Sequence, residues 1–388
     1  MKHLVLTAAA GATLLAATVL PTTSAGAAPA QASGRHSART CAAAPAGYAA
    51  CDARVVVDNS GKPVANATPS GYGPADIQSA YKLAGLTTGS AVAIVDAYND
   101  PTAAADLAVY RSQYGLPACT VAGGCLRITN QSGGSNLPQT NAGWATEISL
   151  DLDMVSAACP SCKILLVEAG SASFANLGAG VNYAATQSGV KAISNSYGGS
   201  DTAQSSAYNH PGIAVTASTG DSGYGIQSPA SYDAVVAVGG TSLTRASNSR
   251  GWSESAWSGA GSGCSTLNAK PSWQTGVTQC SGKAAADVSA VADPNTGVAV
   301  YDSTSYQGRK GWQVYGGTSA SSPIVAGVYA LSGNTSGYPA SIAWGNPSGL
   351  NDVSSGSNGT CSPAVWCTSG AGWDGPTGLG TPNGTSSF

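Results

Sequence analysis

Strand-like and helix-like segments alternate along most of the chain, and this predicts an α/β fold with a mostly parallel central sheet covered by helices on both faces. Short apolar runs typical of buried strands recur between longer stretches with helical periodicity. Hydrophobic residues make up 43% of the 388 residues, so a large core is available and wholesale disorder is excluded.

Each expected element rests on its own pattern. The strands are short runs of apolar, often β-branched residues, and the first of them ends in an acid, Asp96. The helices are longer segments with an apolar repeat of about 3.6 residues. The expected strands are 91–96, 164–167, 192–195, 213–216, 234–238, 297–301 and 313–315. The expected helices are 102–114, 143–158, 173–187 and 319–331. We expect irregular structure over 250–285 and a loop-rich end over 350–388.

The start of the chain predicts a secretory signal peptide over residues 1–27. A short polar start precedes an apolar run over 4–20, and Ala25-Gly26-Ala27 matches the A-x-A cleavage pattern. The alternative is a membrane anchor, but the run falls short of the roughly 18 residues of a spanning helix. Residues 28–70, rich in Ala, Ser, Gly and Pro, are expected to form a mobile leader, and residues 71–388 the folded domain. We therefore expect a secreted, extracellular protein.

Ten cysteines agree with export, because disulfides persist in oxidising compartments. They fall in close sequential pairs, which favours five small-loop disulfides, although spacing alone leaves the connectivity open. The pairs are Cys41/Cys51, Cys119/Cys125, Cys159/Cys162, Cys264/Cys280 and Cys361/Cys367. A zinc site or a redox motif at Cys159-x-x-Cys162 is the weaker interpretation, since no second matched pair lies nearby.

The charge balance excludes several classes of partner. Sixteen basic and nineteen acidic residues give a net charge of −3, and no basic run is present. Nucleic-acid binding driven by phosphate contacts and anchoring of the mature chain to acidic lipids are therefore not expected.

The helix expected over 143–158 carries an unusual pair of acids. At about 100° per residue, Glu147 and Asp151 lie within the apolar stripe, whereas Asp153 lies on the polar face. Paired carboxylates that are buried share a proton and have shifted pKa values, which suits acid–base chemistry. The alternative is a solvated acidic pair.

Two glycine-rich segments carry further candidates. Gly316-Gly317-Thr318-Ser319 places a serine at the start of the last expected helix, where main-chain N–H groups suit a nucleophile whose reaction develops an oxyanion. Ser319 as a plain N-cap is the alternative. Asp221 follows a strand within Gly220-Asp221-Ser222-Gly223, either as a turn cap or as a protonated carboxyl that donates to an oxyanion.

A serine nucleophile needs a base, and the chain has only three histidines. His3 leaves with the signal peptide, His36 lies in the leader, and His210 precedes a proline before a strand. A carboxylate base is the economical alternative, and with a pKa near 4.3 against about 6.5 for histidine it is a base suited to acid.

These motifs, in this order, resemble the sedolisin family of serine-carboxyl peptidases, over about residues 71–382. The resemblance implies a subtilisin-like three-layer fold with a Glu-Asp-Ser catalytic set. It implies that Ser319 attacks the peptide carbonyl while Glu147 takes its proton, and that Asp151 orients Glu147. It implies that Asp221 stabilises the oxyanion. Asp96 falls where some relatives carry an acid that extends the network of catalytic carboxyls.

The resemblance also implies one structural calcium ion near the C-terminus. The family pattern is an Asp with a following aliphatic residue, then G-x-G-x-D, and this chain has Asp352-Val353 and then Gly370-Ala371-Gly372-Trp373-Asp374. The implied ligands are two carboxylates and three main-chain carbonyls, which suit a hard cation. They are Asp352, Val353, Gly370, Gly372 and Asp374. Family members also carry a long folded pro-domain, for which the segment before residue 71 is too short.

We therefore expect a secreted, monomeric peptidase that hydrolyses proteins or peptides in acid. Endopeptidase and tripeptidyl-peptidase activity both stay open. One alternative is a Ser-His-Asp peptidase that uses His210, and another is a non-catalytic protein on the same fold that binds peptides or cell-wall material.

Overall fold

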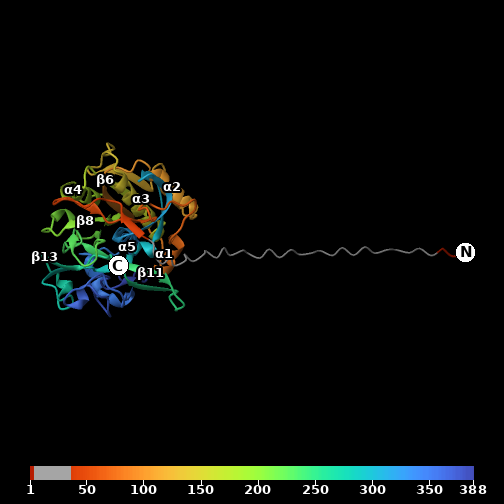
Figure 1. Ribbon diagram of the computed structural model, residues 1–388. Helices are drawn as coiled ribbons and strands as arrows, with labels where there is room; N and C mark the ends of the chain where they lie inside the picture. Colours follow the sequence, from red (N-terminus) through yellow and green to blue (C-terminus); the bar gives the residue numbers. More distant parts are fainter. Residues whose placement is uncertain (4–35) are drawn as a thin grey trace.

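An eight-stranded sheet lies at the centre of the fold (Figure 1). In the computed structural model, which describes residues 1–3 and 36–388, its strands follow the order β12-β11-β9-β7-β4-β6-β5, with β15 also paired to β11. Only the β11–β12 pairing is antiparallel. The expected mostly parallel sheet is confirmed. Its strands are β4 Ala91–Ala97, β5 Leu126–Asn130, β6 Lys163–Ala169, β7 Val190–Asn195, β9 Ala214–Ser218, β11 Val236–Arg245, β12 Trp252–Ala256 and β15 Val288–Val291.

Helices cover both faces of this sheet, as expected for a parallel sheet. Alternate residues of β4 divide between the two cores: Val92 and Ile94 pack with α3 and α5, whereas Ala93 and Val95 pack with α4. The side chain of Asp96 has the same parity as Ile94 and therefore faces α3 and α5. The helices are α1 Pro74–Tyr81, α2 Ala103–Gln113, α3 Ala142–Ala158, α4 Phe174–Ala185, α5 Thr318–Ser332 and α6 Ala340–Gly345.

Smaller sheets surround this centre. One has four strands in the order β1-β3-β17-β16, and its strand β17 leads directly into α5. These strands are β1 His36–Arg39, β3 Arg54–Val57, β16 Val298–Tyr306 and β17 Arg309–Gly316. The remaining strands are β2 Ala50–Cys51, β8 Tyr197–Ser200, β10 Gln227–Ser228, β13 Gly263–Ala269, β14 Gly282–Ala285, β18 Leu350–Asn351 and β19 Thr381–Pro382. The 250–285 segment, expected to be irregular, thus contains three short strands, β12, β13 and β14.

Folded structure begins earlier than residue 71. Residues 36–57, here named the N-terminal strap, form β1, β2 and β3. Strand β3 pairs with β17, and β2 pairs with β8, so the strap is part of the domain rather than a mobile leader. Composition alone misplaced this boundary because the strap is held by pairing with strands far away in sequence. The expected signal peptide falls largely on residues outside those that the structure describes.

Helix α3 has no solvent-exposed face. Every residue from Gly143 to Ala158 is buried. The expectation that Asp153 faces solvent is wrong, because β16 covers that side and the amide of Tyr301 donates to Asp153 Oδ2 at 3.0 Å. The neighbouring Ser156 accepts a hydrogen bond from Arg111 of α2. An apolar stripe on one side of a helix therefore did not imply exposure of the other side.

All five sequential disulfides are confirmed: Cys41–Cys51, Cys119–Cys125, Cys159–Cys162, Cys264–Cys280 and Cys361–Cys367. The bond between Cys159 and Cys162 removes the thiolates that a zinc site would need. Within residues 1–3 and 36–388, no helix is both long and apolar enough to cross a membrane.

A buried ion pair between Lys283 and Asp287 supports the sheet beside α6. Lys283 Nζ lies 2.6 Å from Asp287 Oδ2, and neither side chain is exposed. Replacing Lys283 by Met leaves a buried carboxylate without its cation, so we expect Lys283→Met to lower the free energy of unfolding by about 3–5 kcal/mol. Denaturant unfolding followed by circular dichroism measures it.

The matched control is Lys310→Met, because Lys310 is exposed and takes part in no ion pair in the described residues. We expect this control to change the stability by less than about 0.5 kcal/mol. Equal stability of the two variants would contradict a structural role for the Lys283–Asp287 pair.

Candidate active site

Ser319 and Glu147 come together from two different helices. Ser319 is the second residue of α5 and Glu147 projects from α3. The Ser319 hydroxyl donates to Glu147 Oε2 at 2.9 Å and lies 3.1 Å from the main-chain oxygen of Ser196. Neither Ser319 nor Glu147 is exposed. A serine hydroxyl in direct hydrogen bond with a carboxylate is the arrangement that a nucleophile and its base require, and both residues are ones that the sequence singled out.

The start of α5 depends on a glycine. Gly317 has φ of +100°, a conformation that side chains disfavour, and it forms the N-cap of α5. A Cβ on Gly317 would stand 1.9 Å from the main-chain oxygen of Asp52 and 2.6 Å from Asp221 Oδ2. Gly317 is therefore required both by its backbone angle and by the close approach of two oxygen atoms.

Asp151 lies one turn after Glu147 on α3 and binds Ser196. The Ser196 hydroxyl lies 2.7 Å and 2.8 Å from the two carboxyl oxygens of Asp151. Sequence reasoning missed Ser196, although its place directly after the buried strand β7, before Tyr197 and two glycines, was an available signal. Ser196 therefore links two residues. Its hydroxyl donates to the carboxyl of Asp151, and its main-chain carbonyl lies beside the hydroxyl of Ser319.

Asp96 completes a group of three buried carboxyls with Glu147 and Asp151. Neither carboxyl oxygen of Asp96 has a hydrogen-bond partner, and Glu147 Oε1 also lacks one, among the described residues. Burial raises the pKa of Asp96 to about 8. Burial, and then the charge of Asp151, raises the pKa of Glu147 well above its usual value. Burial, and then the charge of Asp96, does the same to the pKa of Asp151. The group therefore holds protons far more tightly than free carboxyls do.

Asp221 lies at the N-terminus of α5. Its Oδ1 accepts from the amide and the hydroxyl of Thr318, at 2.8 Å and 3.0 Å. Its Oδ2 is buried and has no partner within the described chain. Burial raises the pKa of Asp221 to about 8, so below that pH the carboxyl carries a proton. With Oδ1 occupied as an acceptor, the unpartnered Oδ2 is the position available for this proton.

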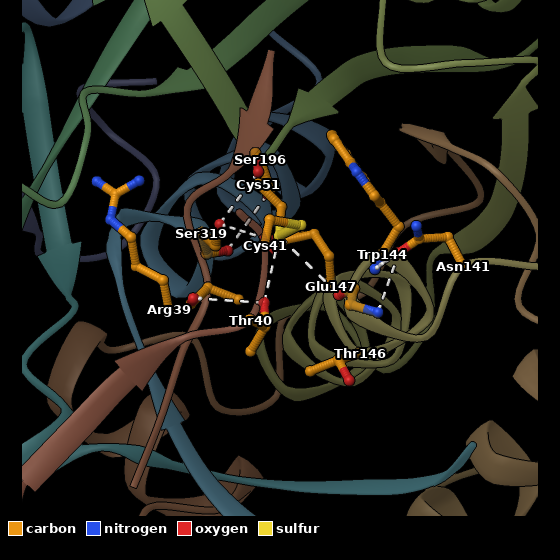
Figure 2. The surroundings of a disulfide bond; sticks show 12 residues. Arg39, Thr40, Cys41, Cys51, Asn141, Trp144, Thr146, Glu147, Ser196 and Ser319 are labelled. Atoms are coloured by element: carbon orange, nitrogen blue, oxygen red, sulfur yellow. Dashed lines mark hydrogen bonds between the residues drawn. A yellow bond between two sulfur atoms is a disulfide. The ribbon is translucent and has the colours of Figure 1, made fainter. Parts of the chain in front are cut away.

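The N-terminal strap covers this group of residues (Figure 2). The Cys41–Cys51 disulfide lies beside Ser319 and Glu147 in Figure 2. Asp52 is buried, and its amide donates to Ser196 O at 3.2 Å. Sequence reasoning missed Asp52. It follows a cysteine in an Ala-rich segment, and nothing in that local sequence indicates contact with Ser196, 144 positions later.

His210 takes no part in the site. Its Nε2 lies 2.9 Å from the main-chain oxygen of Ala207, three residues before it. The partner of the Ser319 hydroxyl is Glu147, so the structure offers no support for a Ser-His-Asp set.

The residues expected to bind calcium meet at one loop. The amide of Gly372 donates to Asp352 Oδ2 at 3.0 Å, and the amide of Gly370 donates to Asp374 Oδ2 at 3.2 Å. Burial raises the pKa of Asp374 to about 6. In the described part of the chain, no three side chains of His, Cys, Asp or Glu gather as a metal-binding group, so a cation here would rely on carbonyl oxygens as well.

Comparisons with known proteins identify the family and the fold. The sequence pattern of the subtilase family, Peptidase_S8, matches residues 119–347. Sedolisin from Pseudomonas sp. (strain 101) is 34% identical over 177 residues, which cover 41% of this chain and 29% of that protein. Kumamolisin from Bacillus sp. (strain MN-32) is 29% identical over 370 residues, which cover 82% of this chain and 63% of that protein. The chain thus spans less than two thirds of the length of these relatives.

A solved structure shows the same fold. Pseudomonas sedolisin, a serine-carboxyl proteinase in complex with two molecules of pseudo-iodotyrostatin, superimposes with a TM-score of 0.68 at 26% identity, covering 81% of this chain and 96% of that one. A lanthipeptide protease superimposes with a TM-score of 0.51 at 15% identity. The subtilisin-like fold expected from the resemblance is confirmed.

The raised pKa values predict that stability falls as pH rises. The pKa is raised to about 8 for Asp96, Asp221 and Glu168, and to about 7 for Asp302. Between about pH 4 and these values the folded state binds protons that the unfolded state has lost. Each such group lowers the free energy of unfolding by about 1.4 kcal/mol per pH unit. Thermal unfolding from about pH 4 to about pH 8 is expected to show a steadily decreasing Tm.

Asp96→Asn tests one contribution to this slope. The amide does not titrate, so the variant should lose less stability between about pH 4 and about pH 8 than the wild type. Asp58→Asn is the control, because the Asp58 side chain is partly exposed and its pKa is lowered, chiefly by the hydrogen bond from the Ser60 hydroxyl. A slope unchanged by Asp96→Asn would show that Asp96 does not hold a proton in this range.

Proposed function

Because this chain belongs to the subtilase family and is similar to the sedolisins, we propose that it is a secreted serine-carboxyl peptidase active in acid. Its substrates are peptide bonds in proteins or peptides. The observation that carries the proposal is the 2.9 Å hydrogen bond from the Ser319 hydroxyl to Glu147 Oε2. Ser319 is the nucleophile and Glu147 the general base.

In the acylation step, Ser319 Oγ bonds to the carbonyl carbon of the substrate while its proton passes to Glu147 Oε2. The carbonyl oxygen becomes negative, and the Asp221 carboxyl donates a hydrogen bond to it from Oδ2. The C–N bond then breaks, and Glu147 returns the proton to the leaving amine. In deacylation, water attacks the acyl-enzyme, Glu147 takes the proton of that water, and the Ser319 hydroxyl is restored.

Asp151 and Asp96 tune the base. Because all three carboxyls lie in one buried group, a negative charge on one raises the pKa of the others. A raised pKa makes ionised Glu147 a stronger base than a free carboxylate, which helps it to deprotonate an alcohol. Ser196 holds Asp151 in place by hydrogen bonding to both of its oxygens.

Asp221 sets the alkaline limit of activity. Its pKa of about 8 means that the donor to the oxyanion is present below that pH and lost above it. Glu147 can act as a base only when it is ionised, so its raised pKa sets the acidic limit of activity. We infer that activity is greatest below neutrality and falls as pH rises through about 8.

Three variants test the catalytic assignment on a denatured protein substrate, with cleavage followed by mass spectrometry from about pH 3 to about pH 8. Wild type should cleave, and Ser319→Ala should be inactive. Glu147→Gln keeps the shape but removes the base, so its kcat/KM should fall by about 10²–10⁴-fold. The fragment lengths also separate endopeptidase from tripeptidyl-peptidase activity.

His210→Ala is the matched control and should stay within about twofold of wild type. Loss of activity in His210→Ala would instead favour a histidine base. Equal inactivity of wild type and Ser319→Ala at every pH would overturn the proposal and favour the peptide-binding alternative, for which the covered position of Ser319 is the supporting observation.

Secretion is part of the same proposal. Five disulfides and no free cysteine in the described residues are typical of proteins that mature in an oxidising compartment. The short polar start and the apolar run over 4–20 supply the signal-peptide pattern.

We further propose a structural calcium site at the loop 370–374. Two carboxylates, Asp352 and Asp374, hydrogen-bond to this loop. The main-chain carbonyls of Val353, Gly370 and Gly372 accept no hydrogen bond from other described residues, so they are available as ligands. This oxygen set fits a hard cation. Bound calcium would neutralise the buried carboxylate of Asp374 and join residues 352–353 to the loop.

Thermal unfolding of the inactive Ser319→Ala protein tests the calcium site without self-digestion. Excess calcium should raise Tm above its value in excess chelator, since about hundredfold saturation adds about 2.7 kcal/mol. Adding Asp374→Asn should abolish this difference, and magnesium should not replace calcium. The same Tm with calcium and with chelator would contradict the site.

A further inference from the structure

A strand of the N-terminal strap lies against the catalytic residues as an added β-strand. Strand β2 pairs antiparallel with β8, with Ala50 opposite Gly198 and Cys51 opposite Tyr197. The next residue, Asp52, donates its amide to Ser196 O, the same carbonyl that lies 3.1 Å from the Ser319 hydroxyl. The main chain of Asp52 is therefore held directly beside the nucleophile.

The carbonyl oxygen of Asp52 lies near the carboxyl group of Asp221. A Cβ on Gly317 would stand 1.9 Å from Asp52 O and 2.6 Å from Asp221 Oδ2, so both oxygens lie around the same point. Asp221 Oδ2 is the unpartnered atom that would donate to an oxyanion. The peptide group of Asp52 and Ala53 thus lies where a bond to be cleaved would lie, with Asp52 on the acyl side.

The side chain of Asp52 enters a polar pocket. Its Oδ2 accepts from the Ser218 hydroxyl at 2.8 Å and from the Gln227 side-chain amide. Beyond it, residues 219–227 and Gly261 line a pocket of about 150 Å³. Ser218 and Gln227 therefore offer two hydrogen-bond donors to a short acidic or amide side chain.

Gln227 is held in a fixed orientation. Its Nε2 also donates to Ser218 O at 3.2 Å, which directs the NH₂ end toward Asp52. Two glycines make room for it: a Cβ on Gly198 would stand 2.0 Å from Gln227 Nε2, and a Cβ on Gly220 would stand 3.0 Å from its amide carbon. A donor fixed in this way favours a partner that can accept and disfavours an apolar side chain, which would leave it unpaired.

We propose that Ala49 to Ala53 occupy the cleft in the register of a substrate, and that Ser218 and Gln227 select an aspartate or asparagine on the acyl side of the cleaved bond. This inference rests on the proposed peptidase function and names the substrate class of the same site. The strap competes with substrate for the cleft, so weakening its grip should increase cleavage of added peptides.

Two peptides test the selection. They are identical except for Asp or Leu before the cleaved bond, and kcat/KM is measured for each at acidic pH with cleavage sites identified by mass spectrometry. The enzyme is Asp52→Ala, which empties the pocket, with Asp52→Asn as the matched variant that keeps an acceptor. Asp52→Ala should cleave both peptides faster than wild type or Asp52→Asn, and the Asp peptide at least about tenfold better than the Leu peptide.

Adding Gln227→Leu to Asp52→Ala should lower this Asp-to-Leu ratio at least about tenfold, because the fixed donor is lost. Gln187→Leu is the control, since Gln187 lies just after the C-terminal end of α4 and accepts a hydrogen bond from Arg127.

Ser319-dependent cleavage that favours the Leu peptide, or an Asp-to-Leu ratio unaffected by Gln227→Leu, overturns the subsite and leaves the peptidase function standing. No Ser319-dependent cleavage of any substrate by wild type or Asp52→Ala overturns the peptidase function itself. If Asp52→Ala does not fold, the same test is made by comparing the Asp-to-Leu ratio of kcat/KM in wild type with the ratio in Gln227→Leu.

Discussion

The burial of three carboxyl groups without a countercharge is the constraint on which the rest of the site depends. Asp96, Glu147 and Asp151 lie between the central sheet and helices α3 and α5, and no cation pairs with any of them in the described residues. Three charges in such a place are too costly, so the group must keep protons. A fold that keeps these protons is expected to be most stable in acid, where the proposed peptidase would also act.

In the proposed mechanism, the same burial explains how a serine becomes reactive without histidine. The hydroxyl of Ser319 has a carboxylate acceptor on one side and the main chain of Ser196 on the other. Across the N-terminus of α5, Asp221 keeps a proton for the opposite task, donation to a developing oxyanion. In the proposed mechanism Glu147 acts as base and Asp221 as acid because their surroundings differ. Glu147 meets a hydroxyl donor, whereas Asp221 has one oxygen occupied and the other free.

The proposed role of the N-terminal strap links this chemistry to selection of substrate. By adding a strand to β8, it uses the pairing edge that an extended peptide would use. It therefore both shields the catalytic group and shows which main-chain and side-chain contacts the cleft offers. The Cys41–Cys51 bond closes the loop that carries this strand, which restricts its motion within the cleft.

Local patterns in the sequence determined the elements and several site residues. The i,i+4 spacing of Glu147 and Asp151, the glycine turn before Ser319 and the close cysteine pairs each act over a few residues, so sequence alone was enough to find them. Tertiary structure alone decided that Asp153 is buried and that residues 36–57 belong to the domain. It also decided that Ser196 meets Ser319 and that Gln227 meets Asp52. These contacts join residues far apart in the chain, and only the packing of α3, α5 and β8 brings them together.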